Sequence, residues 1–114
     1  MNMNAPDQKS KNIGIIAYLT IIGWVIALVM NNEKQSEYAS FHIRQMLGIM
    51  LTGLAINAIT WIQFDYAYFH FADRILQALV FVIWLFGFIP AVQGEKKPIP
   101  FLGDYFQDWF KSIG

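Results

Sequence analysis

Long apolar stretches alternate with short polar ones along this chain. Three windows, residues 13–30, 46–64 and 75–92, hold 18, 19 and 18 residues and no Asp, Glu, Lys or Arg. At ~1.5 Å per residue, a helix of this length approaches the ~30 Å of a bilayer's hydrocarbon core. A soluble amphipathic helix would carry charge on one face every turn or two. The pattern therefore predicts three membrane-spanning helices, over about residues 13–30, 41–64 and 75–92.

Polar segments separate and flank these windows. Residues 1–12 read as a short tail, and the loop that follows the first window carries Glu33, Lys34 and Glu37. Residues 65–74 are short and rich in aromatic side chains, a composition typical of the membrane interface. We therefore expect a polar tail, one three-span membrane domain over residues 13–92, and a separate C-terminal region over residues 93–114.

The C-terminal region has a helical period of its own. Between residues 101 and 113, apolar and aromatic side chains fill one half of a helix, and polar side chains fill the other half. This segment is too short to span, but it can lie in the interface with Phe106, Trp109 and Phe110 towards lipid. A surface helix packed on a protein would show the same pattern. The expected fold is an all-α membrane protein, with three transmembrane helices and a C-terminal amphipathic interfacial helix.

Composition supports membrane insertion. The 114 residues are 56% hydrophobic and only 14% charged, with a net charge of zero, whereas soluble domains carry roughly 25% charged residues. A soluble enzyme domain and a basic nucleic-acid-binding protein are therefore excluded. The expected partners are the lipid bilayer, other membrane proteins or further copies of the chain. The chain has no cysteine, and therefore no disulfide or thiolate site.

Lys and Arg indicate the orientation, because cytoplasmic loops carry an excess of them. With three spans, the N-terminal tail and the second link share one side, which carries Lys9, Lys11 and Arg74. The other side carries Lys34, Arg44, Lys96, Lys97 and Lys111. This balance favours a cytoplasmic C-terminus in a bacterial inner membrane.

The second predicted span is the least apolar of the three. It contains Gly48, Thr52, Gly53 and Asn57. Small residues let helices approach closely, and polar residues form hydrogen bonds across the contact. We expect this span to be the central helix, in contact with the other spans or with a second copy. The alternative is that these residues line a path for a solute.

A polar motif, Phe41, His42, Arg44 and Gln45, stands at the mouth of the second span. Such side chains are costly near hydrocarbon unless they are paired or reach the headgroups. One interpretation is structural: Arg44 binds lipid phosphate, His42 binds loop carbonyls and Gln45 holds a neighbouring helix. The other interpretation is a recognition or proton-sensitive site, because histidine titrates near neutral pH.

No motif for catalysis is found. The sequence lacks a glycine-rich phosphate loop, a His-Glu zinc motif and a nucleophile elbow centred on serine. Catalysis within the membrane would need a polar pair deep in the spans, where Asn57 is the one strongly polar residue. Two isolated histidines are a weak signal for metal. We therefore expect no enzymatic activity, no cofactor and no metal.

Three segments carry a resemblance to a known family: residues 17–19 (Ala-Tyr-Leu), residues 40–47 with their Phe-His-x-x-Gln signature, and the stretch over residues 94–103. Together they resemble a bacterial family of small uncharacterised membrane proteins. That family is related to the chloroplast inner-envelope protein-import component of the Tic translocon. The resemblance extends over roughly residues 13–110 and implies a multi-pass membrane protein without known enzymatic activity.

Two functions are compatible with these observations. The first is a non-enzymatic accessory or scaffold subunit of a larger membrane complex, such as a translocation complex. The second is a small oligomeric channel or transporter with His42, Asn57 and Asp73 along its path. Three short spans cannot enclose a polar route by themselves, so the second function requires an oligomer.

Overall fold

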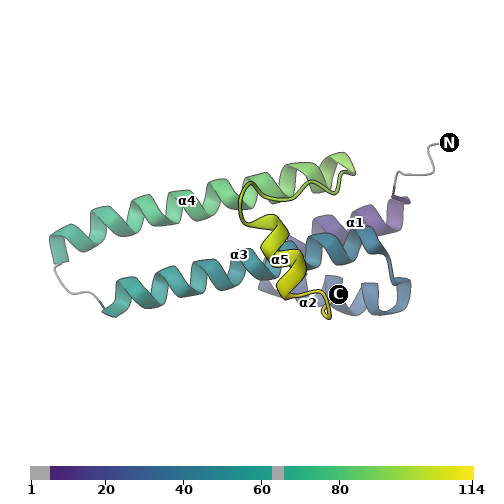
Figure 1. Ribbon diagram of the computed structural model, residues 1–114, viewed down its shortest axis with the longest axis horizontal. Helices are drawn as coiled ribbons and strands as arrows, with labels where there is room; N and C mark the ends of the chain where they lie inside the picture. Colours follow the sequence, from purple (N-terminus) through teal and green to yellow (C-terminus); the bar gives the residue numbers. More distant parts are fainter. Residues whose placement is uncertain (1–5, 63–65) are drawn as a thin grey trace.

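The computed structural model describes residues 6–62 and 66–114, and the side chains outside residues 60–70. This part of the chain is entirely helical (Figure 1). The helices are α1 (Gln8–Ala17), α2 (Ile21–Lys34), α3 (Glu37–Ile62), α4 (Tyr66–Gln93) and α5 (Gly103–Trp109). The prediction of an all-α protein is confirmed. Helix α1 begins at Gln8, inside the stretch that was expected to be a tail.

Helices α3 and α4 form a long antiparallel hairpin that extends well beyond the other helices (Figure 1). Two segments are long and apolar enough to cross a membrane, Glu37–Ile59 on α3 and Phe71–Gln93 on α4. They correspond to the second and third predicted spans. The expected end of the second span, at residue 64, lies outside the described residues.

The first predicted span is wrong, because residues 13–30 are divided between two short helices. Helices α1 and α2 have 10 and 14 residues, or about 15 and 21 Å at ~1.5 Å per residue, less than a bilayer core. An ion pair of 2.7 Å between Lys34 Nζ and Asp7 Oδ2 joins the start of α1 to the end of α2. The two helices therefore fold back on each other, and the start of α1 and the end of α2 lie at the same end of the molecule.

The break lies at residues 18–20, and polar contacts cause it. Thr20 has an extended backbone, and its hydroxyl accepts a hydrogen bond of 3.1 Å from the Gly23 N–H, which caps α2. The Tyr18 carbonyl accepts a hydrogen bond of 2.7 Å from the indole N–H of Trp84 on α4. Gly23 allows the close return of the chain, because a Cβ there would lie 2.5 Å from the Ile16 carbonyl oxygen.

The cap of α1 is charged. The Asp7 carboxylate accepts hydrogen bonds from the Lys34 ammonium and from the Ser10 N–H. These bonds, the one from Lys34 first, lower the pKa of Asp7 to about 2. The carboxylate is therefore ionised at neutral pH, as both the cap and the ion pair require.

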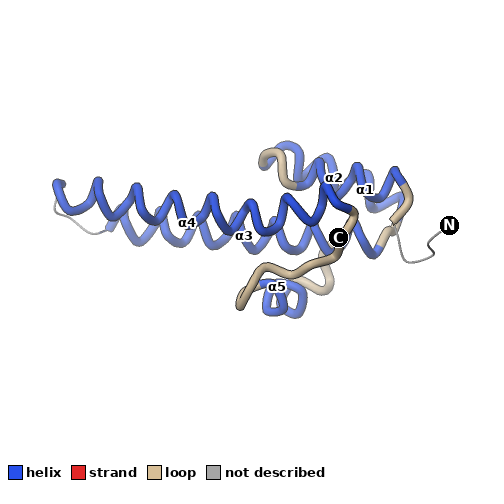
Figure 2. The backbone as a smooth tube through the Cα atoms, turned by 90° about the horizontal axis from the view of Figure 1, so that it is seen from above, coloured by secondary structure: helices blue, strands red, loops and turns tan. Residues whose placement is uncertain are grey.

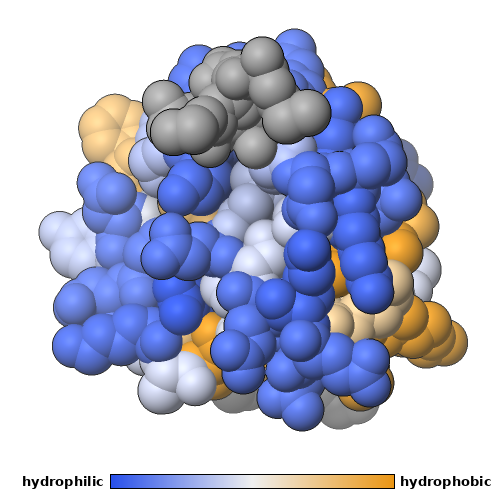
Figure 3. Space-filling view, turned by 90° about the vertical axis from the view of Figure 1, so that its right-hand side faces the viewer, coloured by the Kyte–Doolittle hydropathy of each residue, from blue (hydrophilic) through white to orange (hydrophobic). Residues whose placement is uncertain are grey.

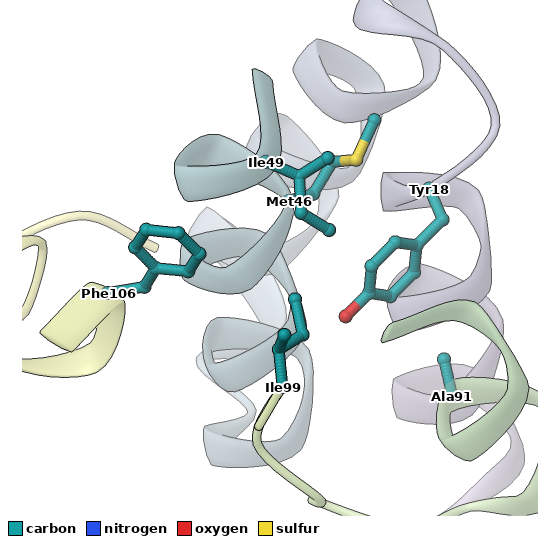
Figure 4. Packing of buried hydrophobic residues seen from close by; sticks show 6 residues of the cluster. All are labelled: Tyr18, Met46, Ile49, Ala91, Ile99 and Phe106. Atoms are coloured by element: carbon teal, nitrogen blue, oxygen red, sulfur yellow. The ribbon is translucent and has the colours of Figure 1, made fainter. Parts of the chain in front are cut away.

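Helix α3 is central and packs against each of the other helices. Helices α1 and α2 lie on one side of the α3–α4 hairpin, and α5 lies on the other side (Figure 2). The main core comprises buried residues from the turn after α1, from the α3–α4 hairpin and from the segment after α4 (Figure 4). These residues are Tyr18, Met46, Ile49, Ala91, Ile99 and Phe106. A second cluster fills the space between α1, α2 and the start of α3.

The outer faces of α2 and α4 are apolar and exposed. Ile22 on α2 and Phe81 on α4 are 73% and 58% accessible. Hydrophilic side chains gather at one end of the bundle (Figure 3). This polar end, as we call it, is formed by the start of α1, the link from α2 to α3 and residues 94–97. An apolar lateral surface with a polar end suits a helix bundle inserted in a membrane.

Candidate functional site

A buried polar cluster lies where α1, α3 and the segment after α4 meet. Tyr18, His42 and Gln45 are between 0 and 1% exposed. The Tyr18 hydroxyl lies 2.6 Å from His42 Nδ1, and Gln45 Nε2 donates to the same hydroxyl over 2.9 Å. The side-chain hydrogen bonds of this cluster join the end of α1 to α3.

Hydrogen-bonding capacity assigns the protons of this cluster. His42 Nε2 lies 2.8 Å from the Glu95 carbonyl oxygen, which can only accept, so Nε2 carries a proton. Burial favours the neutral imidazole, in which Nδ1 has only a lone pair, so the Tyr18 hydroxyl donates to Nδ1 while its oxygen accepts from Gln45. The Gln45 amide oxygen accepts the Ile99 N–H over 2.9 Å. His42 is thus held as the neutral tautomer protonated on Nε2.

The polar motif predicted at the mouth of the second span holds the C-terminal segment, residues 94–114. His42 and Gln45 bind Glu95 and Ile99 on the inner side of α3. On the other side, Arg44 donates from Nε to the Ile113 carbonyl and from Nη2 to the Lys111 carbonyl, each over 2.9 Å. The Phe41 carbonyl accepts from Gln107 Nε2 over 2.7 Å. The motif therefore acts through both faces of one helix on the chain's own C-terminal segment.

Other polar residues stabilise the same region, and the sequence did not point to them. The Tyr38 hydroxyl donates to the Ala91 carbonyl over 2.5 Å, and the Trp24 indole donates to the Ile43 carbonyl over 2.9 Å. The buried Asn31 amide binds the Ser40 hydroxyl over 2.8 Å. Among the described residues, no buried side-chain nitrogen or oxygen lacks a hydrogen-bond partner. Trp24 lies inside an apolar window, and Asn31, Tyr38 and Ser40 lie in the stretch that follows it, so the hydropathy pattern carries no signal of these contacts.

The four small and polar residues of α3 serve different contacts. Gly48 faces α5, where an added Cβ would overlap the Phe106 ring, and the Thr52 hydroxyl donates to the Gly48 carbonyl over 2.8 Å. Gly53 faces α4, where an added Cβ would come within 4 Å only of Val80, at 3.7 Å. Asn57 accepts a hydrogen bond of 2.8 Å from Gln77 of α4.

The C-terminal helix differs from the prediction. It covers Gly103–Trp109 rather than residues 101–113, and its aromatic side chains point in two directions. Phe106 is 3% exposed and lies in the main core, and Phe110 packs against the same cluster, while Trp109 is 63% exposed. The missing side chain of Gly48 leaves room for the Phe106 ring. The expected interfacial aromatic face is therefore shared between the protein core and the outside.

A pocket of about 490 Å3 opens at the polar end, between the end of α2, the first turns of α3 and the C-terminal segment. Charged side chains of both signs border it, with Glu37 on one hand and Arg44 and Lys96 on the other. Gln107 and Phe41 complete the rim on the side of α5. The pocket can therefore bind a polar ligand with both cationic and anionic groups.

The residues of the hypothetical solute path do not meet. His42 and Asn57 are both on α3, fifteen residues or about 22 Å apart at ~1.5 Å per residue. His42 is enclosed at the polar end, and Asp73 lies in the opposite half of α4. No group of three or more His, Asp or Glu side chains that could hold a metal ion occurs in the described part of the chain.

Comparison with known proteins identifies relatives. A family model described as "Heparan-alpha-glucosaminide N-acetyltransferase, catalytic" matches residues 8–102, from α1 to the start of the segment that carries α5. A UPF0132 membrane protein of Methanocaldococcus jannaschii is 23% identical over 105 residues, which are 88% of this chain and 69% of that protein. No solved structure matches.

These findings change one expectation and support another. A relative that is a membrane protein, together with two apolar helices, supports membrane localisation. The expectation of no enzymatic activity is wrong, because the matching family is named for the catalytic domain of an acetyltransferase. The chain contains none of the motifs typical of soluble enzymes that the sequence analysis names, so its residue pattern did not indicate catalysis. Since the family model covers most of the residues, the chain belongs to the family of the heparan-alpha-glucosaminide N-acetyltransferase catalytic domain.

Proposed function

We propose that the chain is a membrane-embedded module for acetyl transfer to an amine, and that the polar-end pocket binds the polar reactants. Family membership supports the type of reaction. The pocket supports its location, because about 490 Å3 falls within the ~300–1,000 Å3 typical of ligand sites. The single observation that carries the proposal is the presence of Glu37, Arg44 and Lys96 around this one open volume.

The chemistry assigns a role to each charge. The amine nitrogen attacks the carbonyl carbon of an activated acetyl group, the bond to the leaving group breaks, and the nitrogen loses a proton. The Glu37 carboxylate can accept a hydrogen bond from the neutral amine and then take up that proton. Arg44 and Lys96 can bind the anionic part of the acetyl donor. His42 is not assigned to the reaction, because it is enclosed and both ring nitrogens are hydrogen-bonded.

The proposal is tested with membrane vesicles from cells that express the whole chain, supplied with radiolabelled acetyl coenzyme A and glucosamine. We expect N-acetylglucosamine to form, and Glu37→Gln to lower the rate by roughly 100-fold or more, as loss of a general base does. Glu33→Gln is the matched control, because Glu33 is also exposed but does not line the pocket. Equal rates for the two variants, or no product above that of vesicles lacking the chain, would refute the proposal.

We propose further that the polar end faces the cytoplasm. Because α1 and α2 fold back, the start of α1, the link between α2 and α3, and the C-terminal segment all lie in the same half of the molecule. Seven of the eight basic residues belong to this half, and Arg74 belongs to the other. This asymmetry is much stronger than the five-to-three balance expected for three spans, and it favours a cytoplasmic polar end.

Single cysteines test this topology, since the natural chain has none. In intact cells, a membrane-impermeant maleimide should label Ala72→Cys at once, and Gln8→Cys and Asn32→Cys only after permeabilisation. All three positions are exposed, so labelling reports the side of the membrane. Three spans would instead make Gln8→Cys behave like Ala72→Cys. Labelling of Asn32→Cys but not Ala72→Cys in intact cells would reverse the orientation.

A role as an accessory or scaffold subunit of a larger membrane complex stays a prediction. The motif that carries the resemblance holds the chain's own C-terminal segment. A protein partner would therefore have to bind another surface, such as the exposed Tyr105 and Trp109 of α5.

A further inference from the structure

A groove of about 690 Å3 runs along the α3–α4 hairpin, beyond the tip of the α1–α2 hairpin. Ile21, the first residue of α2, closes one end. The α3 wall runs from Met46 to Asn57, about 16 Å at ~1.5 Å per residue, and Val80 and Trp84 belong to the α4 wall. Apart from one end, the lining is apolar.

The other end of the groove is polar. Gln77 Nε2 donates to Asn57 Oδ1 over 2.8 Å, and Asn57 Nδ2 donates to the Gly53 carbonyl over the same distance. Both amides are exposed. A glutamine amide has two N–H donors and an acceptor oxygen, so Gln77 can form hydrogen bonds beyond the one to Asn57. In a hydrocarbon environment, the remaining hydrogen-bonding groups of Gln77 favour a ligand that supplies a polar group.

The Asn57–Gln77 pair lies at the depth of the glycerol and ester groups of a lipid. Asp73 and Arg74 precede Gln77 by about 5 Å along α4. Because charged side chains are costly in hydrocarbon, the membrane surface opposite the polar end should lie near Asp73 and Arg74. The hydroxyl and ester groups of a lipid from this leaflet would therefore lie level with Asn57 and Gln77.

The fold also leaves this space open to lipid. Helices α1 and α2 turn back at residues 18–20, so they cover the α3–α4 hairpin only in the half nearer the polar end. Gly53 adds to the space, because an added Cβ there would come within 4 Å only of Val80. The groove is a shallow recess in the lipid-facing surface, next to the tip of the α1–α2 hairpin.

We infer that this groove binds one glycerolipid from the leaflet opposite the polar end. One acyl chain lies between α3 and α4 and reaches towards Trp84 and Ile21. The ester or hydroxyl groups of the lipid form hydrogen bonds with the Asn57–Gln77 pair, and its headgroup lies beside Asp73 and Arg74. The inference is independent of the proposed acetyl transfer, because the polar-end pocket shares no residue with the groove.

The test is native mass spectrometry of the purified chain in mild detergent, titrated with phosphatidylglycerol. We expect one lipid to bind well before any others. Two variants should weaken this first binding step by roughly tenfold or more: Gln77→Leu, which removes the amide, and Gly53→Phe, which fills the groove. Leu79→Phe is the control, because Leu79 is an exposed residue of α4 outside the groove.

Gln77→Leu keeps the test decisive if Gly53→Phe fails to fold, and circular dichroism checks the helical content of each variant. Equal binding by the natural chain, Gln77→Leu and Leu79→Phe would overturn the inference. A dimer in the natural chain that Gln77→Leu abolishes would also overturn it, because a second copy would then occupy the groove.

Discussion

Gly48→Ala is expected to destabilise the protein by about 1–3 kcal/mol relative to Gly53→Ala. The added methyl group at residue 48 overlaps the Phe106 ring, which lies in the main core and has little room to move. At residue 53, the nearest contact would be an ordinary 3.7 Å to Val80. Both substitutions gain the same helix propensity, about 1 kcal/mol. The difference between their effects on the free energy of unfolding therefore isolates the clash with α5.

Thermal unfolding in detergent, followed by circular dichroism, measures this difference. Limited chymotrypsin digestion gives an independent readout, because undocking of α5 should expose Phe106, which is 3% exposed in the natural protein, to cleavage in Gly48→Ala only. Equal melting temperatures and equal digestion rates for the two variants would mean that α5 does not pack on Gly48.

Tyr18→Phe is expected to have the second large effect. The change removes one oxygen but leaves His42 Nδ1 and Gln45 Nε2 buried without their partner. Each buried polar group without a hydrogen bond costs roughly 1–3 kcal/mol. Because His42 and Gln45 also bind Glu95 and Ile99, the loss should loosen the attachment of the C-terminal segment to α3.

Tyr105→Phe is the matched control, since it removes the same atom from a tyrosine that is 57% exposed. We expect its melting temperature to equal that of the natural protein, while Tyr18→Phe melts several degrees lower. A similar melting temperature for both variants would show that the buried cluster contributes little to stability.

The candidate site was predictable in part. The polar motif at the mouth of the second span was recognised from its residues, because a histidine, an arginine and a glutamine within one turn are unusual beside an apolar window. Its ligand was not predictable. His42 binds the carbonyl of Glu95, 53 residues away, and Arg44 binds the carbonyl of Ile113, 69 residues away. Backbone carbonyls are identical in every residue, so no sequence pattern marks them as partners.

Local pattern alone determined that the chain is helical, that α3 and α4 are long and apolar, and that charge is excluded from the lateral surface. These properties depend on side-chain hydrophobicity at successive positions. Only the tertiary structure decided that residues 13–30 fold back instead of crossing. The turn at residues 18–20 depends on the Trp84 indole, 66 residues away, and on the ion pair of Asp7 with Lys34. A hydropathy window averages over Tyr18 and Thr20 and cannot register contacts between distant residues, so the number of spans followed from packing.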